Sequence, residues 1–308
     1  MFETVQSYKR NIQSAKAEQL LARCNIFIDL ALLRAANMAK KDKTFYSLLS
    51  LASDNNGYIT TEYQGRDKVT FRMFVKKGFP NIINMSDPVI LKSMKSRYPN
   101  GKIVELDYAT QEYTIMLSML KILNAPEDPH YTVCDLIRCT RSEAKVINNT
   151  LFYGTDHNYE EVLKTLRKKD AENKVGLKQY LATVVEIRKR INNFVLSHNK
   201  AYATKGFVVN PYGRKLYPKK ESNIFNNIAQ SVGSEVLIDS ILKIEDVIKN
   251  EPVRLLFHKF DSLYFDFSQK ALFECLKKIK CTMETINPNI GLQTKIKIGD
   301  SVGELREL

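Results

Sequence analysis

The sequence predicts an α+β fold in which helices pack against an antiparallel sheet. Of the 308 residues, 44% are hydrophobic, which is enough for a packed core. Segments with helical spacing of apolar residues are mixed with short β-branched runs, without the regular strand–helix alternation of a parallel sheet. The sequence contains no internal repeat and no low-complexity segment, so a repeat architecture is not indicated.

The N-terminal third carries helix signals and then the first strand signal. Residues 1–50 are predicted to be helical because apolar residues recur through 18-EQLLARCNIFIDLALLRAANMA-39. A turn signal, Asn-Asn-Gly at residues 55–57, precedes the strand-like run YITTEY at residues 58–63. Residues 70–100 contain three prolines and are predicted to be irregular.

The rest of the chain alternates between the two patterns. The β-branched run KIVELDYA at residues 102–109 predicts a buried strand that ends near a carboxylate. The other predicted elements are helices at 110–123, 158–200, 223–244 and 269–284, a strand pair at 205–218 that turns at Asn-Pro-Tyr-Gly, two strands within 253–267 joined near Phe260–Ser262, and a strand at 292–299.

The balance of charges indicates a polyanionic partner. Lys plus Arg is 47 and Asp plus Glu is 34, which gives a net charge of +13 and suits nucleic acid, nucleotides or an anionic membrane. The five cysteines are odd in number and form no CxxC pair, so neither a disulfide framework nor a zinc site is expected. No apolar run reaches membrane-spanning length and no signal peptide is present, so we expect a cytoplasmic protein without a membrane partner.

One helical face in 141-RSEAKVINNTLFYG-154 combines cations with an aromatic ring. Arg141, Lys145, Asn149 and Tyr153 are four residues apart and therefore share a face, and Gly154 stands where a helix usually ends. Two cations followed by a ring could hold phosphate and then a base. The alternative is an ordinary solvated helix face.

Two aspartates lie at predicted strand ends in apolar surroundings, Asp107 in VELDYA and Asp261 in HKFDSLYF. A buried carboxylate needs a cation, a donor or a metal. Two such acids on adjacent strands could hold a pair of divalent metals for an in-line phosphoryl displacement. The alternative is that each aspartate caps a strand end or pairs with a local lysine.

The order of motifs resembles that of the family A DNA polymerases, the group of bacterial DNA polymerase I and related phage replicases. The resemblance covers most of the chain. The matching segments, in order, are 56-NGYITTEYQ-64, 70-TFR-72, 80-PNIIN-84, 107-DYATQE-112, 141-RSEAKVINNTLFYG-154, 206-GFVVNPYGRKLYP-218, 226-NNIAQSVG-233, 260-FDSLYFDF-267 and 292-LQTKIKIGDSVGELREL-308.

This resemblance implies a polymerase palm with helical fingers and a reduced or absent thumb. It divides the chain into an N-terminal helical region (1–52), a first palm segment (53–123), fingers (124–204) and a second palm segment with the C-terminal strand (205–308). The implied activity is template-directed DNA synthesis, in which a dNTP is joined to a primer 3′-hydroxyl by a two-metal-ion mechanism. The implied partners are a DNA primer–template and dNTPs.

The resemblance also assigns roles to individual residues. The carboxylates of Asp107 and Asp261 and the backbone carbonyl of Tyr108 would bind two Mg²⁺ ions, with Mn²⁺ as an alternative. Four further roles concern the nucleotide: Arg141 and Lys145 hold the triphosphate, Asn149 lies on the same face, Tyr153 stacks beside the templating position, and Glu112 excludes a ribose 2′-hydroxyl. The implied DNA contacts are Arg72, Asn84, Arg214 and Gln230.

Several positions depart from the family pattern. Asn149 replaces an aromatic residue, Phe260 and Ser262 replace the His and Glu beside the second catalytic aspartate, and Leu216 stands where a second arginine often follows Gly-Arg. About fifty residues precede the palm-like strand, so neither a full thumb nor a proofreading exonuclease is expected in this chain. Another polypeptide could carry those parts, as split phage genes would allow.

These departures leave other functions open. The main alternative is a non-catalytic, degenerate polymerase fold that binds DNA or a partner subunit. A relative of the single-subunit RNA polymerases is a further alternative, against which Glu112 argues. The last is a basic helical protein whose motifs match by chance.

Overall fold

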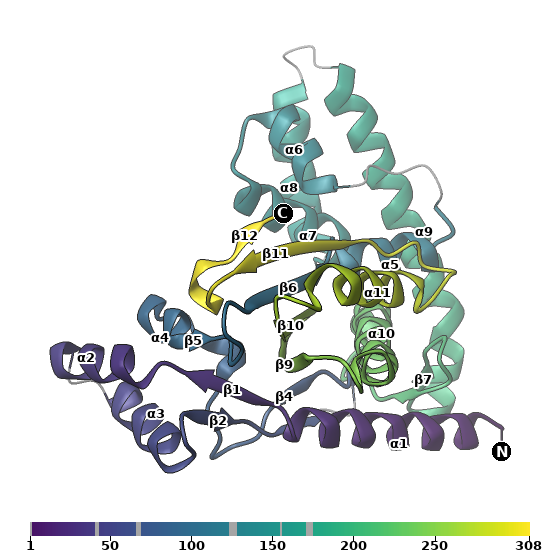
Figure 1. Ribbon diagram of the computed structural model, residues 1–308. Coiled ribbons are helices and arrows are strands. Elements are labelled where there is room, and N and C mark those ends of the chain that lie inside the picture. Colours follow the sequence, from purple (N-terminus) through teal and green to yellow (C-terminus); the bar gives the residue numbers. More distant parts are fainter. Residues whose placement is uncertain (1, 41–42, 66–68, 123–127, 155, 171–174) are drawn as a thin grey trace. The chain divides into compact units, whose positions relative to one another are not determined.

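The computed structural model describes residues 2–40, 43–65, 69–122, 128–154, 156–170 and 175–308. It confirms the predicted α+β class (Figure 1). The chain forms two compact units. Unit 1 consists of Met1–Gln111, Pro211–Arg214 and Ser231–Leu308, and unit 2 of Glu112–Asn210 and Lys215–Gln230. The four-segment division made from the sequence stays a prediction.

A five-stranded antiparallel sheet forms the centre of unit 1. Strand β6 (Lys102–Tyr108) lies between β10 (Ser262–Phe267) and β11 (Thr294–Gly299), which are flanked by β9 (Val253–Lys259) and β12 (Arg306–Glu307). Four consecutive residues of β6 are buried because helices cover the sheet. The Tyr108 hydroxyl, for example, lies 2.7 Å from Ser240 Oγ on α10 (Ile224–Ile248) and donates to the Met283 carbonyl on α11 (Leu272–Thr285).

The prediction that residues 1–50 are helical throughout is wrong at one place. Helices α1 (Phe2–Ala22), α2 (Leu30–Lys40) and α3 (Lys43–Asp54) are present, but Asn25–Ile28 forms strand β1. This strand pairs with β2 (Tyr58–Thr60) on one side and β5 (Met94–Lys95) on the other. Pairing with these distant residues buries Ile26 and Ile28 with a period of two, which overrides the local helical pattern.

The turn predicted at residues 55–57 is confirmed. Asn56 and Gly57 have φ angles of 52° and 89°, a conformation that asparagine and glycine tolerate best. The run that follows is divided between two sheets, because β3 (Tyr63–Gly65) leaves β2 to pair with β4 (Met73–Val75). The segment predicted as irregular also contains the short helices η1 (Ile82–Asn84) and α4 (Pro88–Ser93).

Unit 2 is mainly helical. Its helices surround a core that includes Leu151, Phe152, Leu163 and Val184. The helices are α5 (Gln111–Met119), α6 (Pro129–Ile137), α7 (Arg141–Tyr153), α8 (Asp156–Asp170) and α9 (Val175–Lys205), followed by the predicted hairpin of β7 (Val208–Val209) and β8 (Lys215–Leu216), η2 (Glu221–Asn223) and the first turns of α10. No helix in the described ranges is both long and apolar enough to cross a membrane.

Candidate active site

The two aspartates predicted as metal ligands lie near the end of one strand and in the turn before the neighbouring strand. Strands β6 and β10 are antiparallel, and their register places Ser262 opposite Asp107. Asp261 lies in the turn immediately before β10, and its carbonyl accepts a hydrogen bond from the Tyr108 amide at 3.4 Å. Asp107 therefore lies in a strand and Asp261 lies in the turn that precedes the adjacent antiparallel strand, and their joint role as metal ligands stays a prediction.

Asp107 is held in a half-buried position by the residue that departs from the family pattern. Ser262 Oγ donates a hydrogen bond to Asp107 Oδ1 at 2.5 Å. Burial raises the pKa of the Asp107 carboxyl, and the hydrogen bond from Ser262 opposes this rise. Because burial makes the charged carboxylate costly, a cation beside it would be stabilising.

The donor set fits a hard divalent cation. Carboxylate and carbonyl oxygens are the ligands that Mg²⁺ and Mn²⁺ prefer, and Asp107, Asp261 and the backbone of Tyr108 supply only oxygens. Within the part of the chain that the structure describes, no group of three or more His, Cys, Asp and Glu side chains is arranged as a metal site. The candidate centre is the aspartate pair with the Tyr108 carbonyl, as the resemblance to the polymerases implies.

A second carboxylate on the same face of β6 was missed from the sequence. Glu105 precedes Asp107 by two residues, so both side chains point to one side of the sheet. Glu105 accepts hydrogen bonds from Tyr264 Oη at 2.8 Å and from Lys297 Nζ at 2.9 Å. These three residues and Asp261 line a pocket of about 510 Å³. Strand alternation around Asp107 was the signal that could have identified Glu105.

Three members of the predicted polar face of α7 are exposed. Arg141, Lys145 and Asn149 all reach solvent, and the helix begins with a capping box between Thr140 and Glu143. Arg141 also has partners within unit 2, because its Nη2 lies 3.1 Å from Asp128 Oδ2 and its guanidinium lies 5.3 Å from the centre of the Tyr131 ring.

Tyr153, the fourth member of this face, is packed differently. Its ring stacks against Phe225 with centroids 6.2 Å apart, and its hydroxyl is buried without a hydrogen-bond partner among the described residues. Burial raises the pKa of Tyr153 well above its ordinary value, and the charge of Glu112 adds to the rise. Tyr153 lines a pocket of about 740 Å³ together with Arg188, Lys220 and Asn226.

Glu112 and Gln230 come together in the same unit. Glu112 lies in the first turn of α5, and Gln230 Nε2 donates to its Oε1 at 3.5 Å. Unit 2 thus groups Glu112, Gln230 and Tyr153, which are far apart in the sequence. The aspartate pair belongs to unit 1.

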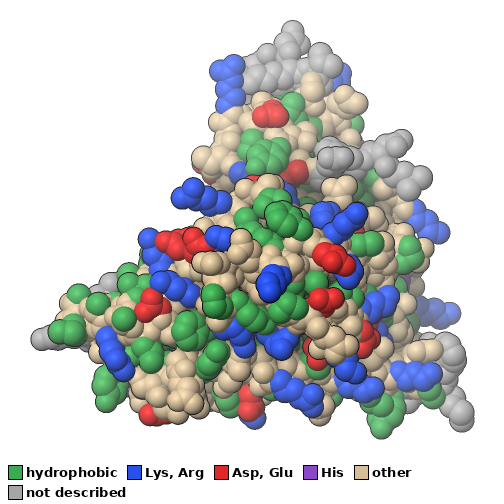
Figure 2. Space-filling model, in the orientation of Figure 1, with side chains coloured by type: hydrophobic (Ala, Val, Ile, Leu, Met, Phe, Trp, Pro, Cys, Tyr) green, Lys and Arg blue, Asp and Glu red, His purple; other side chains and the backbone are tan. Residues whose placement is uncertain are grey.

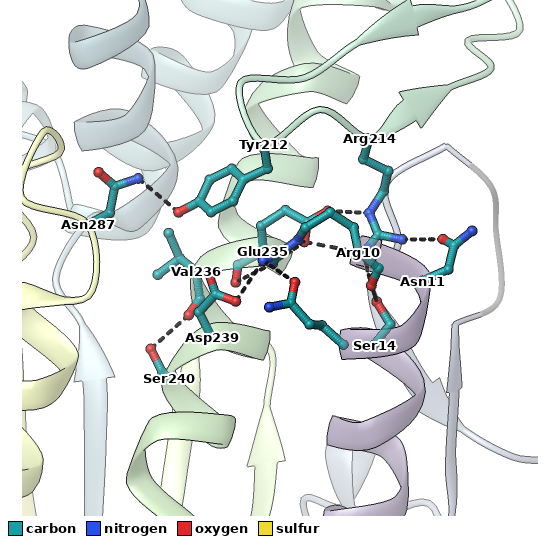
Figure 3. A network of polar contacts seen from close by, with 11 residues as sticks. Arg10, Asn11, Ser14, Tyr212, Arg214, Glu235, Val236, Asp239, Ser240 and Asn287 are labelled. Atoms are coloured by element: carbon teal, nitrogen blue, oxygen red, sulfur yellow. Dashed lines mark hydrogen bonds and ion pairs between the residues drawn. The ribbon is translucent and has the colours of Figure 1, made fainter. Parts of the chain in front are cut away.

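The predicted DNA contacts in unit 1 have different surroundings. Asn84, at the end of η1, is exposed, and Arg72 is half-buried. Arg214 is 0% exposed, and its guanidinium forms an ion pair with Glu235 and hydrogen bonds with Asn11 and Ser14 (Figure 3). The predicted DNA contact of Arg214 is therefore corrected to a structural role, because its donors are already engaged inside the protein.

The chain was compared with curated proteins, with solved structures and with protein-family models. No curated protein matches the chain. A solved structure with the same fold is the POL domain of Pol1 from M. smegmatis in complex with DNA primer-template and dNTP, at 20% identity and a TM-score of 0.67. The similarity covers 88% of this chain and 52% of that one, so the chain spans about half the length of the matched structure. The family model described as DNA polymerase family A matches residues 3–304, and the chain therefore belongs to DNA polymerase family A.

Proposed function

We propose that this chain is the synthetic part of a DNA polymerase, which transfers a nucleotide from a dNTP to a primer 3′-hydroxyl under the direction of a template. The register that places Asp261 beside the end of β6, next to Asp107, carries the proposal. Membership of the family supports it. We assign the palm to the sheet of unit 1 and the fingers to the helices of unit 2.

The residues of unit 1 hold the metal-binding oxygens in place. Asp107, Asp261 and the Tyr108 carbonyl would bind two Mg²⁺ ions, or Mn²⁺ instead, and such ions stabilise the charge on the attacking and leaving oxygens. The Tyr108 side chain fixes the end of β6 through Ser240 and Met283. Ser262 orients one oxygen of Asp107 and leaves the other for a metal.

The exposed face of α7 is suited to a triphosphate. Lys145 offers a solvated ammonium, and Arg141 offers a fork that can grip two phosphate oxygens. Arg141 would exchange its exposed ion pair with Asp128 for the more highly charged nucleotide. Asn149, which lies between Lys145 and Tyr153 on this face, would contact the nucleotide through its amide.

The group around Tyr153 is suited to the sugar and the template base. Glu112, held by Gln230, would lie under the sugar and exclude a 2′-hydroxyl. The residues that line the pocket beside Tyr153 include two with a buried oxygen that has no hydrogen-bond partner in the described chain, the Tyr153 hydroxyl and Asn226 Oδ1, which supports entry of a polar, planar group such as a base. Gln230, with Arg72 and Asn84, would contact the minor groove.

We assign synthesis without proofreading to residues 1–308, because the family model accounts for residues 3–304 and the matched structure is a polymerase domain. A separate polypeptide that carries a thumb or an exonuclease belongs to the same proposal. Its test is whether an added candidate polypeptide forms a stable complex with this chain and increases the length of extended products.

A non-catalytic DNA-binding module is the second candidate function. The observation that favours it is Ser262, which occupies the place of a carboxylate and hydrogen-bonds the main metal ligand. In that case the chain would bind DNA and extend no primer with either metal.

Primer extension separates these functions. A primer–template is incubated with Mg²⁺ or Mn²⁺ and with dNTPs and NTPs in separate reactions, and DNA affinity is measured in parallel by fluorescence anisotropy. We expect extension with dNTPs by the parent, and no extension with unchanged DNA affinity for Asp261→Ala. DNA binding without extension in every condition would establish the module, and a preference for NTPs would indicate an RNA polymerase.

A further inference from the structure

Two aromatic rings and four lysines gather at the β7–β8 hairpin of unit 2. The Phe207 and Tyr217 rings have centroids 6.0 Å apart at 55°, and Tyr217 is 47% exposed. We call these rings and the surrounding lysines the hairpin platform. Its members are Lys205, Phe207, Lys215, Tyr217, Lys219 and Lys220.

The hairpin ladder turns these rings outward. Val208 and Leu216 face each other in the register and are buried at its core. Because neighbouring residues of a strand point to opposite faces, Phe207 and Tyr217 lie on the outer side. The Tyr202 hydroxyl on α9 donates to the Pro218 carbonyl at 2.9 Å, which fixes the backbone beside Tyr217. The platform is therefore a preorganised surface.

The lysines surround the rings, and the nearest acidic residue in the sequence is Glu221, whose carboxylate accepts a hydrogen bond from Asn199. The Nζ atoms of Lys215 and Lys205 lie 4.6 Å and 5.9 Å from the centre of the Phe207 ring, and Lys219 and Lys220 are exposed just beyond. Residues 205–220 contain no Asp or Glu. Cation–π contacts alone could explain two of the lysines, but they do not explain the exposed ring or the other two cations.

We propose that the hairpin platform binds single-stranded DNA. An unpaired base can stack on an exposed ring, while the adjacent phosphates lie among the lysines. The bases of a duplex are already stacked on one another and cannot use such a ring. The identity of the bound strand rests on the proposed function: it is the unpaired part of the template ahead of the primer terminus.

A tryptophan introduced at Tyr217 provides a direct probe, because the chain contains no tryptophan. In Tyr217→Trp, we expect a fifteen-residue oligothymidylate, about the length that such sites cover, to quench the tryptophan fluorescence through stacking. The matched control is Tyr46→Trp on α3, since Tyr46 is also exposed (68%) and lies in unit 1 outside the platform. Quenching in the control alone, or in neither variant, overturns the proposal.

Affinity measurements test the two components of the site. We expect Tyr217→Ala to weaken binding of labelled oligothymidylate roughly fivefold to a hundredfold and to change blunt-duplex affinity little. Lys219→Ala should lower, by about 0.7, the slope with which the logarithm of oligonucleotide affinity falls with the logarithm of salt concentration. The charge control is Lys277→Ala, because Lys277 is an exposed lysine on α11. Unchanged oligonucleotide affinity in Tyr217→Ala overturns the proposal.

The two proposals fail separately. The first outcome is that the parent extends a primer on a template with a one-base overhang while Tyr217→Ala binds oligothymidylate as tightly as the parent. This outcome would reject the platform and support the polymerase. Quenching of Tyr217→Trp by oligothymidylate in a chain that extends no primer would reject the polymerase and keep the platform.

Discussion

In our proposal, Asp107 serves metal binding at the expense of stability. Its raised pKa means that the folded state holds this proton more tightly than the unfolded state, so stability falls as pH rises through the titration of the group. We predict that Asp107→Asn raises the thermal unfolding temperature at neutral pH and that this gain disappears in the ordinary titration range of aspartate. The same variant should lose at least roughly a hundredfold in extension rate.

Thermal unfolding across pH and primer extension check this prediction. The control is Asp300→Asn, which removes an exposed carboxylate paired with Lys102. Substantial extension by Asp107→Asn would refute the assignment of this residue as a metal ligand.

Lys145 offers the cleanest test of the nucleotide face, because it is exposed on α7. Lys145→Ala removes one charge-assisted contact to the triphosphate, worth about 1.5–3 kcal/mol, and should lower the efficiency of dNTP use about tenfold to over a hundredfold. Single-nucleotide incorporation kinetics measure the effect, and DNA affinity should hardly change. Lys164→Ala on α8 is the matched control. Equal losses in both variants would indicate a general charge effect.

Glu112 determines sugar selection in our proposal. Glu112→Ala should increase incorporation of ribonucleotides relative to deoxynucleotides by about tenfold or more. Gln230→Ala removes the 3.5 Å hydrogen bond to this carboxylate together with the proposed minor-groove contact, and it should change the ratio of ribonucleotide to deoxynucleotide incorporation less than Glu112→Ala does. Parallel extensions with dNTPs and NTPs give the ratio. If Glu112→Ala leaves the ratio of ribonucleotide to deoxynucleotide incorporation unchanged, Glu112 does not select the sugar and only accepts the hydrogen bond from Gln230.

At the scale of elements, α1 is fixed to α10 by a buried ion cluster (Figure 3). Glu235 is fully buried and pairs with both Arg10 and Arg214. Removing one member of a buried ion cluster leaves charges without compensation, so Glu235→Gln should lower the free energy of unfolding by about 3–5 kcal/mol. Urea denaturation measures this loss. The control Glu274→Gln breaks an exposed pair with Lys278 and should change stability by less than about 1 kcal/mol.

The elements differ in how well the sequence specifies them. Strand β6 was predicted from an apolar, β-branched run, and the hairpin of β9 and β10 from two apolar and aromatic runs joined at a short polar break. Strand β1 was missed because its four residues lie in a continuous apolar stretch and their partners are distant in the sequence. The burial of Arg214 was missed for a related reason: its charge is compensated by Glu235 on α10, and its remaining acceptors lie on α1, about 200 residues away.

The candidate site was predictable where local pattern determines it. The shared face of Arg141, Lys145 and Asn149 follows from helical periodicity alone. The neighbouring aspartates followed from the order of strands, which the resemblance to a family supplied. The buried Tyr153 hydroxyl and the contacts of Glu105 depend on side chains from several elements, so periodicity could not reveal them.

For the whole molecule, the excess of basic residues should govern DNA binding. Lysine and arginine side chains are spread over the face drawn in Figure 2, rather than gathered in one patch. We predict that the logarithm of primer–template affinity falls linearly with the logarithm of salt concentration, with a slope of about 0.9 for each phosphate neutralised. Fluorescence anisotropy across a salt series measures the slope. A flat response would mean that the net charge of +13 serves a purpose other than DNA binding.

The contact between Arg214 and Phe71 has a consequence for how this sequence can evolve. The Arg214 guanidinium lies 4.1 Å from the centre of the Phe71 ring. Phe71 directly precedes Arg72 in the chain. A change at Arg214 therefore disturbs both a buried ion cluster and the loop of a proposed DNA contact. A single substitution at Arg10, Arg214 or Glu235 leaves the remaining buried charges uncompensated and gives an unstable protein. These three positions should therefore change together during evolution or not at all. An alignment of homologues would then show Arg10 on α1 and Glu235 on α10 replaced in the same sequences.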